Sequence, residues 1–165
     1  MRGTGYILIA NVVSRQFNKC NPELEAETSE LRVTIMHESV ARSGRTISIR
    51  KTPPVIRLTI QKALEEGYCG RDLLALLMNC VQVKMNFVFC GEPGVGKTEC
   101  AKFFSQFIPA NERVITIEDT LELRYNQTNP GKDCIEMKVS EDTFGYAQAL
   151  KSSLRLVPHK IQNSF

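Results

Sequence analysis

The amino-acid sequence predicts an α/β fold with a parallel sheet, preceded by a small α+β N-terminal domain. Beyond residue 56, short apolar runs alternate with segments of helical periodicity, and a glycine-rich loop joins one such run to one such segment. Strands that alternate with helices usually form a parallel sheet. Paired prolines separate this part from a strand-like beginning. We expect an N-terminal domain over residues 1–51, a linker over 52–56, and the α/β domain over 57–165.

The composition is typical of a globular protein and excludes several functional classes. Apolar residues make up 42% of the chain, and the net charge of +3 gives no reason to expect nucleic-acid binding. The six cysteines form no C-x-x-C pair, so we expect neither a zinc site nor a disulfide set. No segment approaches the ~20 apolar residues that span a bilayer.

The N-terminal region contains two strand candidates. Residues 6–13 are apolar but short, and they predict a buried strand or a helical turn in preference to a secretory signal. Arg45–Arg50 alternates polar and apolar residues, which predicts a half-buried strand. Pro53 and Pro54 can continue neither a strand ladder nor a helix, so the linker is placed there.

The rest of the chain predicts helices and buried strands in alternation. A helix over Ile56–Glu66 ends at Gly67, and a second begins near Asp72 and runs to about Cys80. The apolar run Met85–Cys90, just before the glycine-rich loop, predicts a buried strand. The later elements are a helix over Thr98–Phe107, a strand over Arg113–Ile117, and a helix over Phe144–Leu156 that ends at Pro158.

The loop Gly91–Thr98 fits the phosphate-binding pattern G-x-x-x-x-G-K-[ST]. The glycines let the backbone turn its N–H groups toward an anion, and the following helix adds the positive end of its dipole. Lys97 is expected to reach the β- and γ-phosphates, and the Thr98 hydroxyl to ligate Mg²⁺. A chance match occurs in about one per cent of chains of this length. The predicted nucleotide-binding residues are Gly91, Glu92, Pro93, Gly94, Val95, Gly96, Lys97 and Thr98.

Three carboxylates follow the predicted strand Arg113–Ile117. They are Glu118, Asp119 and Glu122. Ligands of open α/β sheets bind at the carboxyl ends of strands, so these acids are candidates to orient a water molecule or to hold the shell of a metal ion. The alternative is a strand end that meets solvent, where acidic residues are common.

Four segments of the chain together resemble one known family. They are Gly44–Lys51, the loop Gly91–Thr98, the acidic stretch Ile115–Leu123, and Tyr146–Arg155 with Pro158. From Leu31 to Ile161, the chain resembles the type II/IV secretion (traffic) ATPases, closest to the branch that serves tight-adherence pili and type IV secretion. The loop matches the family's Walker A motif, and the acidic stretch matches its "Asp box".

The resemblance implies a RecA-like ATPase domain that uses ATP and Mg²⁺ in a motor subunit for secretion or pilus assembly. It implies a hexameric ring, an inner-membrane platform protein as partner, and a cytoplasmic location or a peripheral one at the inner membrane. Arg50, and less directly Arg32, match the region that supplies positive charge to the phosphates. The alternative for both is a solvent-facing strand arginine.

The last residues depart from the family pattern. The segment 158–165 has the sequence Pro-His-Lys-Ile-Gln-Asn-Ser-Phe, without the family's acid after the proline or its Walker B glycine and glutamate. We therefore expect a C-terminally truncated member in which the Walker B strand and histidine box are absent, and in which hydrolysis is weak or lost. The alternatives are a non-catalytic nucleotide-binding fragment or assembly module, and a small-molecule kinase.

Overall fold

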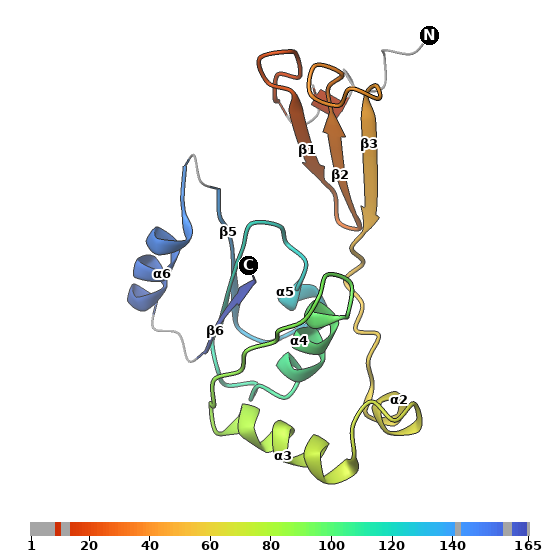
Figure 1. The fold of residues 1–165 in the computed structure, drawn as a ribbon. Helices are drawn as coiled ribbons and strands as arrows, with labels where there is room; N and C mark the ends of the chain where they lie inside the picture. The colour runs from red at the N-terminus through yellow and green to blue at the C-terminus, as the bar shows by residue number, and fades with distance from the viewer. Residues whose placement is uncertain (1–8, 11–13, 141–142, 157–159, 165) are drawn as a thin grey trace. The chain divides into compact units, whose positions relative to one another are not determined.

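The computed structural model describes residues 9–10, 14–140, 143–156 and 160–164. The chain divides into two compact units, Met1–Pro53 and Pro54–Phe165, and each is described by itself (Figure 1). Within the described residues, no helix combines the length and the apolar character that a membrane span requires.

The first unit is built on an antiparallel sheet whose three strands follow one another in chain order. The strand β1 (Glu23–Glu27) pairs with β2 (Leu31–Met36), and β2 pairs with β3 (Thr46–Lys51). Leu24 and Ile35 are partners in the ladder between β1 and β2, and both side chains are fully buried. The core of this unit therefore lies against β1 and β2.

The strand β3 confirms the strand predicted for Arg45–Arg50, but the predicted half-burial is wrong. Ile47 and Ile49 are 44% and 61% exposed. The physical reason is that β3 is an edge strand: Ile47 and Ile49 lie on the core face, but the residues that cover this face cluster against β1 and β2. Of the apolar segment 6–13, only residues 9 and 10 are described, and both are helical.

Two helices open the second unit, as predicted, although the first is shorter than expected. They are α2 (Ile60–Glu65) and α3 (Arg71–Gln82). Residues 56–59 are not helical because Thr59 caps α2, and its hydroxyl accepts the N–H of Lys62 at 3.1 Å. Gly67 has a φ of 67°, a conformation that commonly follows the end of a helix.

A three-stranded parallel sheet in the order β5-β4-β6 forms the centre of the second unit (Figure 1). Its middle strand, β4 (Val114–Glu118), is buried along its whole length and confirms the predicted strand Arg113–Ile117. The helices α4 (Lys97–Ser105) and α6 (Tyr146–Arg155) confirm two more predictions, while Pro158 lies outside the described residues. The flanking strands are β5 (Cys134–Lys138) and β6 (Lys160–Ser164), and a short helix, α5 (Tyr125–Thr128), precedes β5.

Side chains alternate along β4, so one face of the strand packs against α6 and the other against α4. Ile115 and Ile117 pack with Ala149 of α6. Val114 belongs to the same core cluster as Phe103 of α4. Successive residues of a strand point to opposite faces, so Glu118 shares the face of Val114. The strand therefore places the carboxylate at its end on the side of the sheet that α4 covers.

The prediction that Met85–Cys90 is a buried strand is wrong. These residues carry neither strand nor helix, and Val88 is 86% exposed. A buried strand needs a hydrogen-bonded neighbour, and among the described residues no strand pairs with this segment. Phe87 and Phe89 instead stack on Phe104 of α4, and their ring centroids lie 5.9 and 6.2 Å, respectively, from that of Phe104. Aromatic contacts with α4 thus hold in place the segment that precedes the glycine-rich loop.

The strand β6 was not predicted from the sequence, and its residues include neither the glycine nor the glutamate of the Walker B pattern. It pairs in parallel with β4, and Ile161 is the partner of Ile115. Its sequence, Lys-Ile-Gln-Asn-Ser, lacks the β-branched run that predicts a strand. Hydrogen bonding to the buried strand β4 therefore accounts for its strand conformation. None of its five residues carries a carboxylate.

The aromatic cluster on α4 should be a principal source of stability in the second unit. Phe103 is 1% exposed and makes edge contacts with Phe104 and Phe107. We predict that Phe103→Ala lowers the free energy of unfolding by about 3–5 kcal/mol, measured by urea denaturation. The control Leu76→Ala, on a side chain that is 58% exposed, should change it by less than about 0.5 kcal/mol.

If Phe103→Ala fails to fold, the milder Phe103→Leu should still lower the urea midpoint below that of Leu76→Ala. Equal midpoints for Phe103→Leu and Leu76→Ala would contradict the assignment of the core.

Candidate functional site

The glycine-rich loop Gly91–Thr98 leads directly into α4, which begins at Lys97. Gly96 caps the helix with φ 92° and ψ 21°, a left-handed conformation that residues with a Cβ rarely adopt. A Cβ on Gly91 would lie 2.9 Å from Cγ2 of Val95. The loop therefore depends on glycine to turn tightly, and such a turn can direct backbone N–H groups toward an anion.

The Lys97 side chain folds back over this loop. Its Nζ donates hydrogen bonds to the carbonyl of Gly91 at 2.8 Å and to the carbonyl of Glu92 at 3.0 Å. The ammonium group thus lies near the first turn of α4, where the helix dipole is positive. A full positive charge beside a helix N-terminus is an arrangement that favours a phosphate group.

A second segment reaches the start of α4 from the end of β4. The Thr98 hydroxyl donates to Oε2 of Glu122 at 3.1 Å, and both residues are partly buried. Hydroxyl and carboxylate oxygens are the hard donors that Mg²⁺ prefers. The residues present therefore fit a magnesium ion next to the loop.

Glu118 lies behind this contact and is fully buried. Its Oε2 accepts the backbone N–H of Glu122 at 2.8 Å and that of Leu123 at 2.9 Å. Burial raises the pKa of Glu118 above its ordinary value of 4.5, and the two backbone hydrogen bonds act in the opposite direction. Glu118 thus holds the backbone of the turn that carries Glu122.

Asp119 differs from its neighbours in exposure and in partner. It is exposed, and its Oδ1 accepts the N–H of Thr120 at 2.6 Å. The structure therefore brings Glu122 to Thr98, whereas Glu118 and Asp119 accept hydrogen bonds from backbone groups of the same turn. The sequence alone did not show that the three acids have different partners, and it did not single out Leu123. The alternation of side chains along β4 is the signal that could have separated Glu118 from Asp119.

The two arginine candidates lie in the other unit. Arg50 is on β3 and Arg32 on β2, directly opposite each other in the ladder. The Arg32 guanidinium donates to Oε1 of Glu25 at 2.9 Å. Their part in a phosphate site stays a prediction.

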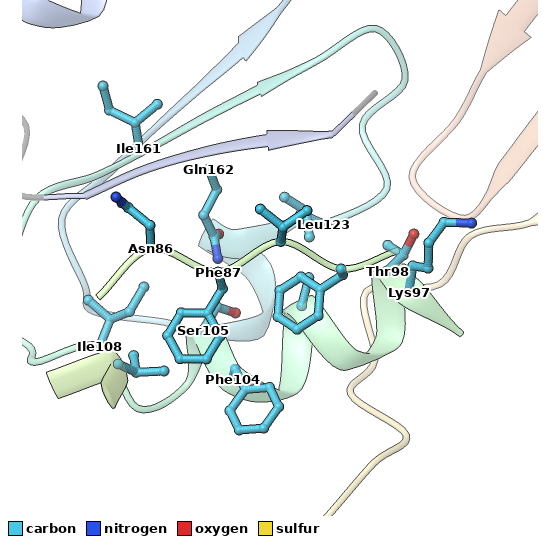
Figure 2. A pocket seen from close by; sticks show the side chains of 14 residues that line it. Asn86, Phe87, Lys97, Thr98, Phe104, Ser105, Ile108, Leu123, Ile161 and Gln162 are labelled. Carbon is cyan, nitrogen blue, oxygen red and sulfur yellow. The ribbon is translucent and has the colours of Figure 1, made fainter. Parts of the chain in front are cut away.

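A cavity of about 450 Å³ lies beside the loop (Figure 2). Residues 86–89, one side of α4, Leu123 and two residues of β6 line it, with Lys97 and Thr98 at one end. Gln162 of β6 also lines the cavity, and its buried Oε1 has no hydrogen-bond partner in the described part of the chain. The mostly apolar lining does not suit a triphosphate, whose charges need the N–H groups of the loop. We therefore assign the phosphate-binding candidate to the loop and not to this cavity.

Comparisons with known proteins point to one family. The family model for type II/IV secretion system proteins matches residues 16–162. The type IV secretion system protein VirB11 of Bartonella quintana is 36% identical over 107 residues, which are 62% of this chain and 29% of that protein. Protein VirB11 of Agrobacterium fabrum is 35% identical over 105 residues, 61% of this chain and 29% of that protein. The chain thus spans about three tenths of the length of these relatives.

A solved structure shows the same likeness in three dimensions. The crystal structure of the VirB11 ATPase from the Brucella suis type IV secretion system, in complex with sulphate, matches with a TM-score of 0.50 and 25% sequence identity. The match covers 94% of this chain and 52% of that one. The arrangement of helices around the parallel sheet is therefore shared with part of that ATPase.

Burial of Glu118 gives stability a defined dependence on pH. A raised folded-state pKa means that the folded chain holds the proton more tightly than the unfolded chain does. The contribution is therefore fully present below the unfolded pKa and is lost as the pH rises through the folded pKa. We predict that the free energy of unfolding of the parent, measured in urea, falls relative to that of Glu118→Gln as the pH rises above 4.5, the ordinary pKa of the carboxyl. A difference between the two proteins that is constant with pH would contradict this.

Proposed function

This chain belongs to the type II/IV secretion system protein family, and we propose that it is an ATP-binding motor subunit of a bacterial secretion or type IV pilus-like assembly system. The observation that carries the proposal is the convergence, at the start of α4, of a tight glycine-rich loop, the Lys97 ammonium and the Thr98–Glu122 contact. This set of groups combines anion binding with hard oxygen ligands for a divalent cation.

Each group has a distinct task in the proposed site. The backbone N–H groups of residues 91–98 surround the phosphates, and Lys97 exchanges its two loop carbonyls for phosphate oxygens. The Thr98 hydroxyl ligates Mg²⁺, which when bound neutralises charge on the phosphoryl oxygens. Glu122 holds the Thr98 hydroxyl in place, and Asp119, which is exposed, is the candidate to orient an attacking water.

The assembly around the site is also part of the proposal. We place this subunit in a hexameric ring, in the cytoplasm or at the inner-membrane surface, against a membrane platform protein of the secretion or pilus machine. The VirB11 names of the matched relatives support a role in type IV secretion. Arg50, and less directly Arg32, are proposed to supply positive charge to the phosphates. We expect no nucleic-acid partner.

A second candidate function is nucleotide binding without turnover. The observation that favours it is β6, which pairs with β4 at the edge of the site but carries no carboxylate. Hydrolysis needs a positioned water and a complete metal shell, and β6 adds no acidic side chain to either. In this alternative the chain binds ATP as an assembly module or an inhibitor of longer subunits.

Binding of Mg-ATP should stabilise the purified chain through Lys97. At a hundredfold excess of ligand over its Kd, we predict a gain of about 2.7 kcal/mol in unfolding free energy, seen as a rise in Tm. Lys97→Ala should abolish the rise, because the loop then lacks its ammonium group. The control Lys151→Ala, on the exposed face of α6, should keep it.

Phosphate release by the same proteins separates the candidates. Lys97-dependent release of inorganic phosphate supports the motor, and binding without release supports the non-catalytic module. Transfer of phosphate to a metabolite would instead indicate a small-molecule kinase. A Tm that does not respond to Mg-ATP would overturn nucleotide binding.

A further inference from the structure

The turn between β4 and α5 carries the carboxylate that meets the glycine-rich loop, yet residues 121–123 form no helix or strand. Backbone N–H groups in such a turn need partners from elsewhere. The N–H groups of Glu122 and Leu123 both find one in the same atom, Oε2 of Glu118, at 2.8 and 2.9 Å. The conformation of the turn therefore depends on one buried side chain.

The surroundings of Glu118 suit a structural anchor. The residue is fully buried at the end of β4, and its own backbone carbonyl accepts the N–H of Val139 at 2.8 Å. Leu123, next to the bonded amide of Glu122, is only 4% exposed, so the far side of the turn is also fixed by burial. An anchored residue on each side leaves the Glu122 carboxylate with little freedom to leave Thr98.

We propose that Glu118 is a positioning residue: through its two backbone hydrogen bonds it sets Glu122 against the Thr98 hydroxyl, without itself contacting nucleotide or metal. This assignment rests on the proposed Mg-ATP site and gives Glu118 a different role from its neighbours Asp119 and Glu122. Glu122 is then the acid that reaches the ligand side, and Glu118 acts through it.

The chemistry of the two hydrogen bonds distinguishes a positioning residue from a ligand. A glutamine amide oxygen accepts two N–H groups as a carboxylate oxygen does, so Glu118→Gln keeps the turn but removes the charge. Alanine removes the acceptor, and aspartate, shorter by one methylene, withdraws it from the two amides. A metal ligand or a base needs the carboxylate itself and would lose its function with glutamine as well as with alanine.

The first test measures the Kd of the full chain for Mg-ATP by calorimetry, with Glu118→Gln, Glu118→Ala and Glu118→Asp compared. We expect Glu118→Gln to stay within about threefold of the parent, and the other two to bind at least about tenfold more weakly, the equivalent of one lost hydrogen bond. Equal losses with glutamine and alanine would overturn the proposal in favour of a direct role for the charge. Parent-like binding by Glu118→Ala would overturn it in favour of no role.

The second test follows hydrogen exchange of the Glu122 and Leu123 amides without nucleotide. Exchange of these two amides should be faster in Glu118→Asp than in the parent and unchanged in Glu118→Gln. Because this readout needs neither ATP nor the alanine variant, it decides the proposal even if Glu118→Ala does not fold. If the parent does not bind Mg-ATP, the proposed function fails, while the exchange data still show whether Glu118 holds the turn. Unchanged exchange in Glu118→Asp would refute the positioning role.

Discussion

The hydrogen bond between Thr98 and Glu122 joins two segments that the packing of the second unit brings together. One segment is the glycine-rich loop with the start of α4, and the other is the turn after β4; the two partners are 24 positions apart in the chain. Neither segment alone offers both an anion cradle and a set of hard oxygen donors. The candidate site is therefore a product of tertiary packing and not of the loop motif by itself.

That packing is set by the buried strand β4 and by the phase of its side chains. Ile115 and Ile117 fix α6 on one face, and Val114 belongs with the aromatic residues of α4 on the other. The same alternation turns Glu118 inward, where its Oε2 accepts two backbone N–H groups of the turn. Stability of the sheet and geometry of the site thus rest on the same few residues.

The sequence predicted the elements that carry strong local signals and failed where tertiary pairing decides. Periodicity and breakers located α3, α4, α6 and β4, and the loop pattern Gly91–Thr98 singled out the region of the site. The run Met85–Cys90 has strand composition but no strand partner in the described chain, whereas the polar residues of β6 form a strand because β4 pairs with them. Because Glu118, Asp119 and Glu122 are close in sequence, they were predicted as one group. Only a three-dimensional structure shows which of these acids accepts the hydroxyl of Thr98 and which accept backbone N–H groups.

A double-mutant cycle on Thr98 and Glu122 tests most directly whether this contact assembles the site before any ligand binds. The free energy of unfolding in urea would be measured for the parent, Thr98→Val, Glu122→Ala and the double variant, all without nucleotide. We predict a coupling free energy of about 0.5–3 kcal/mol, as found for residues in direct contact. Effects that add within about 0.3 kcal/mol would contradict it, because the two segments would then be independent of each other in the free chain.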